Sequence, residues 1–257
     1  MTLDYNQVIV LMGHIWWPSV RLTGFFIIAP LFSDRSAPVK LRILLVMVLS
    51  FIAASLIRHD EATIIRASNE ILLTTFKELL IGAAIGLLFN FLRVTFTQAG
   101  QIISMQMGLS MAVMNDPVNG DSASLISKLY GLVFILLFLS FDGHIIAVQT
   151  LFQSYHHFPL TTYFSTNDIL HIVKTLSWCF SMSLVIAIPS IGLMLLSSFT
   201  FGVLSKVAPS LNIFALGFPM TIVIGILSIA INMINFGELF LMSSEQIDEI
   251  IIQLLGE

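Results

Sequence analysis

The chain has 257 residues, of which 57% are hydrophobic and 10% are charged, and its formal net charge is −4. Soluble domains are about 45–50% apolar and about 25% charged, so this composition excludes an ordinary water-soluble domain. The small acidic charge excludes a basic nucleic-acid-binding surface. Cys179 is the single cysteine, which excludes an internal disulfide and a metal cluster built from cysteines.

Apolar stretches long enough for helices recur along the chain, at 8–32, 41–57, 71–100, 125–152, 169–204 and 211–242. The alternation of apolar and polar residues that is typical of outer-membrane barrels is absent. The sequence therefore predicts an all-α, polytopic membrane-type protein built from helical hairpins.

Several of these stretches contain residues that are unfavourable against lipid and usually face protein or a wet cavity. Proline inside such a helix needs neighbours that satisfy the carbonyl it frees. We therefore expect a packed bundle with interrupted helices. The residues concerned are Pro18, Arg21, Lys77, Glu78, Arg93, Pro189, Pro219, Asn232, Asn235 and Glu238.

The last two stretches carry the clearest signal. Residues 175–237 contain a single charged side chain, Lys206, which separates two uncharged runs of 31 residues each. A membrane-spanning helix needs about 20 apolar residues, so each run exceeds this length. The intervening 206–212 contain a charge, a proline and an asparagine, and the sequence predicts a hairpin of two long helices.

Residues 101–124 contain four of the twelve methionines within ten positions, at Met105, Met107, Met111 and Met114. Turn-forming residues end the segment at 115–117 and 119–120. Methionine is unbranched and deformable, so a cluster can seal a gap and still yield to varied partners. Apolar constrictions also gate pores by dewetting. Ordinary core filling is the competing interpretation.

Two smaller patterns bear on helix packing. Gly82 and Gly86 form a G-x-x-x-G pair, which allows another helix of this chain or of a partner subunit to approach closely. Asn232, Asn235 and Glu238 recur every three residues, which predicts one shared helix face. We interpret them as hydrogen-bonding residues between helices, with a polar conduit as the alternative.

Residues that could support catalysis or metal binding do not form a recognisable set. Four histidines lack the spacing of metal ligands, and a polar loop is the favoured interpretation. They are His144, His156, His157 and His171. Asp142 and His144 have no accompanying G-x-S-x-G nucleophile motif, and no phosphate-binding loop is present. The sequence predicts a protein that is not an enzyme and has no cofactor.

Three segments together resemble one protein family across about residues 15–225. They are Arg21-Leu-Thr-Gly-Phe-Phe-Ile-Ile-Ala-Pro30 with Pro38, Lys40 and Arg42; Met107-Gly-Leu-Ser with Asp116-Pro117, Gly143-His144, Ser154 and Pro159; and Ala187-Ile-Pro189 with Gly202-Val-Leu-Ser-Lys-Val-Ala-Pro209-Ser-Leu-Asn212-Ile-Phe-Ala-Leu-Gly217-Phe-Pro219. This pattern is similar to the FliR family, a membrane subunit of the flagellar type III protein export gate that is related to the T-type subunit of injectisomes. Lys206 stands where the family more often has arginine, and Ser210 where glutamine is usual.

The resemblance implies a single-copy core subunit of the flagellar export channel in the bacterial inner membrane, at the flagellar basal body. Such a subunit closes a ring of P-type and Q-type subunits, engages the B-type switch subunit and helps to gate the passage of unfolded flagellar proteins. It also implies a P-type-like part at 1–168 and a Q-type-like hairpin at 169–257. An injectisome export subunit is the near alternative.

The resemblance further implies a plug loop at about 101–124, in which Met105, Gln106, Met107, Met111 and Met114 close the pore. It implies subunit packing for a second set of residues, namely Arg21, Gly82, Gly86, Lys206, Pro209, Asn212, Gly217 and Pro219. A secondary transporter is a more distant alternative, with Arg21, Lys77, Glu78 and Glu238 as coupling residues. Structural pairing within the bundle is the favoured interpretation of those four.

Overall fold

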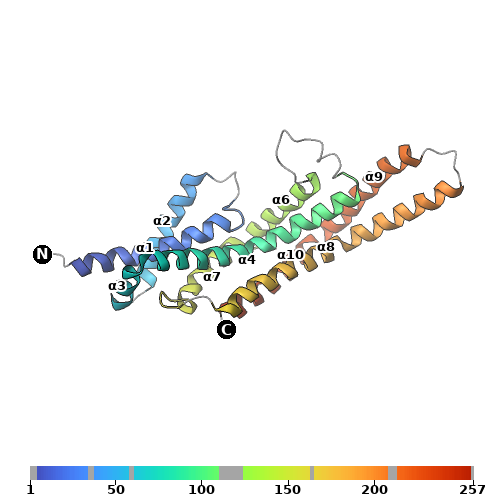
Figure 1. The fold of residues 1–257 in the computed structure, drawn as a ribbon. Helices are drawn as coiled ribbons and strands as arrows, with labels where there is room; N and C mark the ends of the chain where they lie inside the picture. The colour runs from blue at the N-terminus through green and yellow to red at the C-terminus, as the bar shows by residue number, and fades with distance from the viewer. Residues whose placement is uncertain are drawn as a thin grey trace. The chain divides into compact units, whose positions relative to one another are not determined.

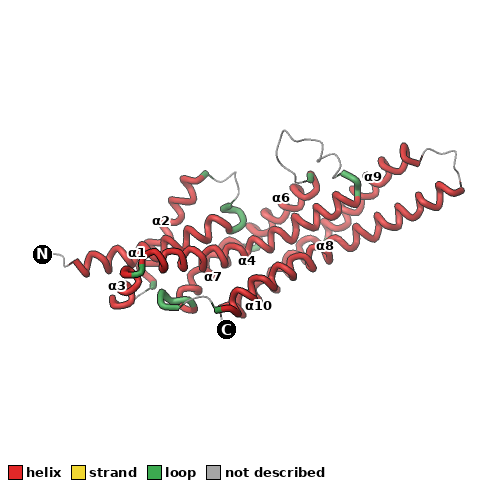
Figure 2. Tube along the Cα trace, viewed as in Figure 1, coloured by secondary structure: helices red, strands yellow, loops and turns green. Residues whose placement is uncertain are grey.

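The computed structural model describes residues 5–33, 38–57, 61–109, 124–162, 165–207 and 213–255. Within these ranges the chain forms helices joined by loops, with no strand (Figure 2). This confirms the predicted all-α fold class. In chain order, the helices are α1 (Tyr5–Ile28), α2 (Val39–Leu56), α3 (Glu61–Asn69), α4 (Ile71–Gln106), α6 (Leu125–Ser140), α7 (Gly143–His157), α8 (Thr166–Val207), α9 (Ile213–Ile234) and α10 (Phe236–Leu255) (Figure 1).

The predicted hairpin of two long helices is confirmed by α8 and α9. The helix α8 ends at Val207 and α9 begins at Ile213, so the two helices are separated at the predicted position. A polar contact joins the two helices, because Asn232 of α9 donates to the Ser190 hydroxyl in the middle of α8.

The helices are interrupted, as predicted, but not at the prolines. The helices α1, α8 and α9 continue through Pro18, Pro189 and Pro219. The apolar stretch 125–152 is instead divided at Asp142, which adopts a left-handed conformation with φ 56°. The adjoining Gly143 has no room for a side chain, because a Cβ there would lie 2.5 Å from the Phe138 ring.

The second interruption lies at Asn235, between α9 and α10, where the chain bends by 60°. The Asn235 amide donates to the Asn232 carbonyl, and its own carbonyl accepts from Leu239, so it ends one helix and begins the next. The expected single helix over 211–242 is therefore wrong in this detail.

The chain forms two compact units that are not contiguous in sequence. The first comprises residues 1–91, 138–175 and 247–257, and the second comprises residues 92–137 and 176–246. The predicted boundary at residue 168 separates a part that resembles P-type subunits from a part that resembles Q-type subunits. This boundary stays a prediction.

The core of the first unit is built on α1 and the N-terminal part of α4. Phe25 and Phe26 of α1 are buried and pack edge to face, with ring centroids 5.4 Å apart. The helix α1 also packs against α2 and against α3. The short helix α3 was not expected from the sequence, because its residues are too polar to form an apolar stretch.

The core of the second unit is an aromatic cluster. Phe96 of α4 lies at its centre, with the Phe236 and Phe134 ring centroids 5.0 Å and 5.5 Å away. Tyr130 and Phe240 extend the cluster, and all five side chains are almost fully buried. Aromatic pairs at these separations add stability beyond their buried area, so the cluster joins α4, α6 and α10 firmly.

Much of the described surface is apolar. Three helices, α2, α4 and α8, are each long and apolar enough to cross a membrane, and the number rises to five if the pairs α6–α7 and α9–α10 are each counted as one span. Along α2 only Ser50 and Ala53 are buried. Phe199 and Val207 near the end of α8 are 72% and 77% exposed, which is unfavourable unless lipid or protein covers them.

Candidate functional site

The methionine-rich segment 101–124 begins within α4, which ends at Gln106, so its first six residues are helical and not part of a loop. Gly108 has a φ of 76°, a conformation that favours glycine, and its amide donates to the Met105 carbonyl at 3.0 Å. The Leu109 amide donates to the Ser104 carbonyl at 3.2 Å. This pair of bonds is a Schellman motif, which terminates a helix sharply. The loop predicted to plug the channel therefore leaves α4 at a fixed point.

The predicted gate residues occupy different environments. Met105 is 50% exposed and Gln106 is also exposed, so both side chains are available to a pore or a partner. Met107 is 1% exposed and packs on α9, where a Cβ placed on Gly225 would lie 2.6 Å from its Cγ and Cε atoms. Met107 therefore anchors the start of the loop in the core of the second unit. Met111 and Met114 lie outside the described residues.

A buried charge cluster lies in the first unit. Arg21 is fully buried, and its Nε donates to Glu78 Oε2 at 2.7 Å. Its two terminal nitrogens donate to the Ser154 hydroxyl at 3.1 Å and to the Phe158 carbonyl at 2.6 Å. The guanidinium also lies 4.1 Å from the centre of the Tyr155 ring. The planar fork of arginine suits such a set of partners, which a lysine could not satisfy together.

Lys77 extends this cluster on α4. Its ammonium donates to the Leu160 carbonyl and lies 3.7 Å from Glu78 Oε1. Two cations thus share one carboxylate, and the Ser154 hydroxyl and two carbonyls of the turn after α7 are further acceptors. The cluster fixes that turn against α1 and α4. Sequence reasoning identified Arg21, Lys77 and Glu78 but missed the two carbonyls, which no sequence pattern marks.

Three of the four coupling residues of the transporter hypothesis meet in one place. Arg21, Lys77 and Glu78 meet in the first unit, where their hydrogen bonds are made within the protein. Glu238 belongs to the second unit and is exposed on α10. This arrangement favours structural pairing for the three buried charges.

Three glycines bring α1 and α4 into close contact. A Cβ on Gly82 would lie 1.9 Å from the Arg21 carbonyl oxygen, and one on Gly24 would lie 2.3 Å from the Leu79 carbonyl oxygen. A Cβ on Gly86 would lie 2.8 Å from the Phe25 carbonyl oxygen. The contact that the G-x-x-x-G pattern predicted is thus present within the chain. A role in subunit packing for Gly82 and Gly86 stays a prediction.

The polar residues of α9 separate at the helix break. Asn232 is buried and its amide donates to the Ser190 hydroxyl at 2.9 Å and to the Ile186 carbonyl at 3.4 Å, which confirms hydrogen bonding between helices at this position. Asn235 and Glu238 are exposed. The prediction that all three share one helix face is wrong, because the helix ends between Asn232 and Asn235.

Replacing Asn232 with alanine should lower the free energy of unfolding by about 1–2 kcal/mol, because Ser190 and the Ile186 carbonyl lose a buried partner. Thermal unfolding of the purified chain in detergent measures this effect. Asn235→Ala is the matched control and should change the free energy by less than about 0.5 kcal/mol, since its side chain is exposed. Equal effects of the two variants would contradict the assignment.

The remaining predicted packing residues lie on the α8–α9 hairpin. Lys206 is exposed in the last turn of α8, where a cation is favourable to the helix dipole. In α9, Gly217 is half-buried and Pro219 is exposed. Pro209 and Asn212 lie outside the described residues. The exposed positions are compatible with contact to another subunit, which stays a prediction.

Within the ranges that the structure describes, no group of three or more His, Cys, Asp or Glu side chains could hold a metal ion. His156 and His157 are adjacent in the last turn of α7, His144 lies at the start of that helix, and His171 lies in α8.

Comparisons with known proteins match nearly the whole chain. The profile of the family described as "Bacterial export proteins, family 1" matches residues 12–247. The chain is 33% identical to the flagellar biosynthetic protein FliR of Escherichia coli (strain K12), over 82% of this chain and 80% of that protein. It is 31% identical to the FliR of Buchnera aphidicola subsp. Schizaphis graminum, over 88% of each.

A relative with a different name also matches. The surface presentation of antigens protein SpaR of Shigella flexneri is 28% identical, over 76% of this chain and 75% of that protein. The family profile covers both compact units, including the buried charge cluster and the start of the methionine-rich segment. On these matches, the chain belongs to the FliR family of bacterial export proteins.

Proposed function

We propose that this chain is a core subunit of the flagellar type III protein export channel in the bacterial inner membrane. In this proposal one copy closes a ring of P-type and Q-type subunits at the flagellar basal body, and it helps to gate the passage of unfolded flagellar proteins. Residues 1–168 form the P-type-like part and residues 169–257 the Q-type-like hairpin. The B-type switch subunit engages the assembled channel.

This proposal rests on the family membership of the chain and on its exposed apolar surface. Nine large apolar residues of α2 are exposed, and so are Leu195, Phe199 and Val207 of α8. Inner-membrane residence accounts for part of such a surface, and contact with sibling subunits accounts for the rest. The exposed cation Lys206 lies at the end of α8 beside these exposed apolar residues. We expect a partner subunit to cover this end of the α8–α9 hairpin.

The flagellar assignment is favoured over the injectisome assignment by the degree of similarity. The two FliR relatives from Escherichia coli and Buchnera are 33% and 31% identical, over more than four fifths of the chain. The SpaR relative is 28% identical over a smaller share. Secretion into the culture medium distinguishes the two assignments.

Deleting this chain from its host should abolish secretion of hook and filament proteins and should abolish motility. Returning the full chain should restore both. Immunoblots of the culture medium measure the effect, with total cell protein as the control for synthesis. Continued filament secretion by the deletion strain would overturn the proposal, and loss of a different set of secreted proteins would support the injectisome alternative.

The proposed gate makes a separate prediction. Replacing Met105, Met107, Met111 and Met114 together with alanine should let ions leak through the closed channel, because smaller side chains leave a wetted gap. Conductance of membranes that contain the assembled complex measures the leak. Met47→Ala is the control, since Met47 is 66% exposed on α2, away from the predicted loop in sequence. Unchanged conductance in the fourfold variant would reject the gate.

Met105→Ala alone should raise the leak without a loss of stability, because its side chain is half-exposed. Met107→Ala should also lower the free energy of unfolding by about 2–5 kcal/mol, because it empties a buried site beside Gly225. Comparing the ion leak and the unfolding free energy of the two single variants therefore distinguishes a role in closing the pore from a role in packing.

A further inference from the structure

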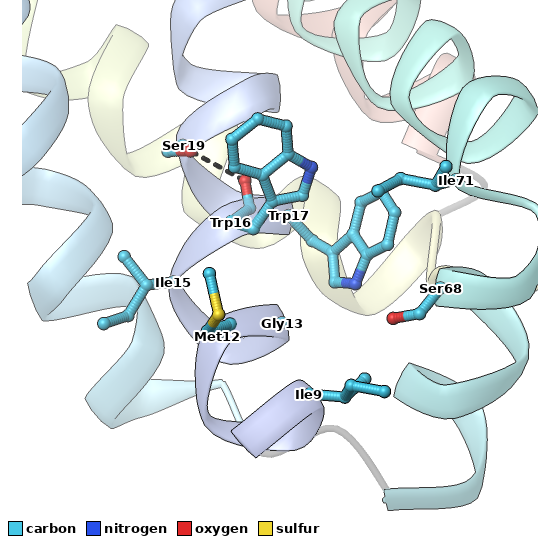
Figure 3. Close-up of a pocket in the computed structure, with 9 residues that line it drawn as sticks. All are labelled: Ile9, Met12, Gly13, Ile15, Trp16, Trp17, Ser19, Ser68 and Ile71. Carbon is cyan, nitrogen blue, oxygen red and sulfur yellow. Dashed lines mark hydrogen bonds between the residues drawn. The ribbon is translucent and has the colours of Figure 1, made fainter. Parts of the chain in front are cut away.

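A pocket of about 610 Å³ lies in the first unit, between α1, α3 and the first residue of α4 (Figure 3). Its volume falls within the range of about 300–1,000 Å³ that small-molecule sites occupy. The walls are mainly apolar, with Ile9, Met12 and the two adjacent tryptophans Trp16 and Trp17 among them. None of the described residues that line the pocket is charged, so it suits a neutral, apolar group.

The pocket contains one buried donor without an acceptor. Trp17 is 1% exposed, and its indole N–H has no hydrogen-bond partner. Figure 3 shows this nitrogen directed toward Ser68 and Ile9, within the pocket. Buried tryptophans usually find an acceptor, and even the half-buried Trp178 does so by donating to Gln246 at 2.7 Å. A ligand with a carbonyl oxygen would supply the acceptor that Trp17 lacks.

No hydrogen bond joins the Trp17 indole to another polar group at the pocket. The Ser19 hydroxyl already donates to the Trp16 carbonyl at 2.7 Å, a contact drawn in Figure 3. Trp17 also packs in a small core cluster with Ala67 and Leu160, which holds the ring in place.

The position of the pocket favours a membrane lipid. Ile71 lines it and is also the first residue of α4, one of the helices able to cross a membrane. The preceding α3 carries exposed Glu61, whereas Leu72 and Phe76, which follow Ile71, are apolar and 85% and 61% exposed. This change from polar to apolar surface marks the level of a membrane interface, where tryptophans are enriched. Ester carbonyls of phospholipids lie at the same level.

We propose that this pocket binds an acyl chain of a phospholipid, whose ester carbonyl accepts a hydrogen bond from the Trp17 indole. The apolar walls hold the upper part of the chain, and the charged headgroup stays outside because the pocket offers it no partner. This site is separate from the methionine-rich segment, so it stands or falls independently of the proposed gate.

The test uses the full chain extracted from membranes with its accompanying subunits, titrated with two isotope-labelled phosphatidylethanolamines. One carries ester-linked chains and the other carries ether-linked chains, which lack the carbonyl. Mass spectrometry counts the bound lipid. The wild-type chain should bind the ester lipid roughly 2- to 10-fold more tightly, which is the effect of one hydrogen bond.

Two substitutions connect this preference to the pocket. Trp17→Phe removes the N–H and should abolish the preference for the ester lipid, and because the donor lacks a partner without lipid, folding should be preserved. Ser68→Phe fills the pocket and should eliminate saturable binding. Trp178→Phe and Ser244→Phe are the matched controls and should leave both the count and the preference unchanged.

Equal affinity of the wild-type chain for the two lipids would overturn the proposal. So would a preference that persists in Trp17→Phe, since the carbonyl would then bind elsewhere. A photoreactive residue at position 12 gives a third measurement. Crosslinks to phospholipid support the proposal, and crosslinks to a protein subunit in its place would show that a partner fills the pocket.

Discussion

Replacing Arg21 with methionine should destabilise the chain by about 3–5 kcal/mol, because Glu78 then stays buried without its closest countercharge. The turn after α7 also loses the hydrogen bond that the Phe158 carbonyl accepts. The amount of chain in membranes should fall accordingly. Thermal unfolding in detergent and quantitative immunoblots of membranes measure the two effects.

The matched control is Lys206→Met, which removes a charge from an exposed position and should change stability by less than about 0.5 kcal/mol. Arg21→Lys should fail to rescue the loss, since an ammonium cannot reproduce the three-partner geometry of the guanidinium. Replacing Arg21, Lys77 and Glu78 together by apolar residues should recover much of the stability, because the desolvation penalty disappears with the charges. Wild-type unfolding of Arg21→Met would contradict this account of the cluster.

Replacing Gly82 with alanine should also be strongly destabilising, at the upper end of the range of about 1–3 kcal/mol typical of overpacking, or above it. The added Cβ would lie 1.9 Å from the Arg21 carbonyl oxygen and 2.8 Å from the carbonyl carbon, so the α1 backbone itself must move. That movement also displaces Arg21 from the charge cluster. Thermal unfolding of the purified variant measures the loss.

Gly192→Ala in α8 is the control for this substitution. A Cβ at Gly192 has nothing within 4 Å, so alanine should be neutral or should stabilise the helix by up to about 1 kcal/mol. The same chemical change is thus expected to act in opposite directions at two helical glycines. A neutral Gly82→Ala would show that α1 and α4 are not in close contact in the folded protein.

The two large effects are coupled through α1. Gly82 determines how closely α1 approaches α4, and this approach brings the Arg21 guanidinium within 2.7 Å of Glu78. A double variant, Gly82→Ala with Arg21→Met, should therefore lose less stability than the sum of the single variants.

Sequence patterns predicted the long helices well, but they did not identify the residues at which helices are interrupted. The hairpin of α8 and α9 follows from two uncharged runs and one break, because charge is excluded from apolar surroundings over the whole length of a helix. The positions of the helix breaks were not predicted, and the prolines do not mark them, since Pro18 and Pro189 lie inside continuous helices. The actual breaks lie at Asp142, which adopts an uncommon left-handed conformation, and at Asn235.

At the candidate site, too, the sequence predicted the segment but not the environment of its individual residues. The methionine-rich segment was evident from composition, but nothing in its spacing distinguishes Met105, which is exposed, from Met107, which is buried beside Gly225. Likewise, the indole of Trp17 differs from that of Trp178 only in its surroundings, because one has an acceptor and the other has none. Such differences arise from residues that are far apart in the chain.

The sequence by itself determined the class of this protein, its long apolar helices and its membership in an export family, because these depend on composition and on local order along the chain. Only the tertiary structure decided which charges meet, which glycines touch a neighbouring backbone and which methionine is exposed. Those outcomes depend on contacts between residues separated by tens of positions, as between Arg21 and Ser154. No local pattern encodes such a contact, since its energy exists only after the helices have packed.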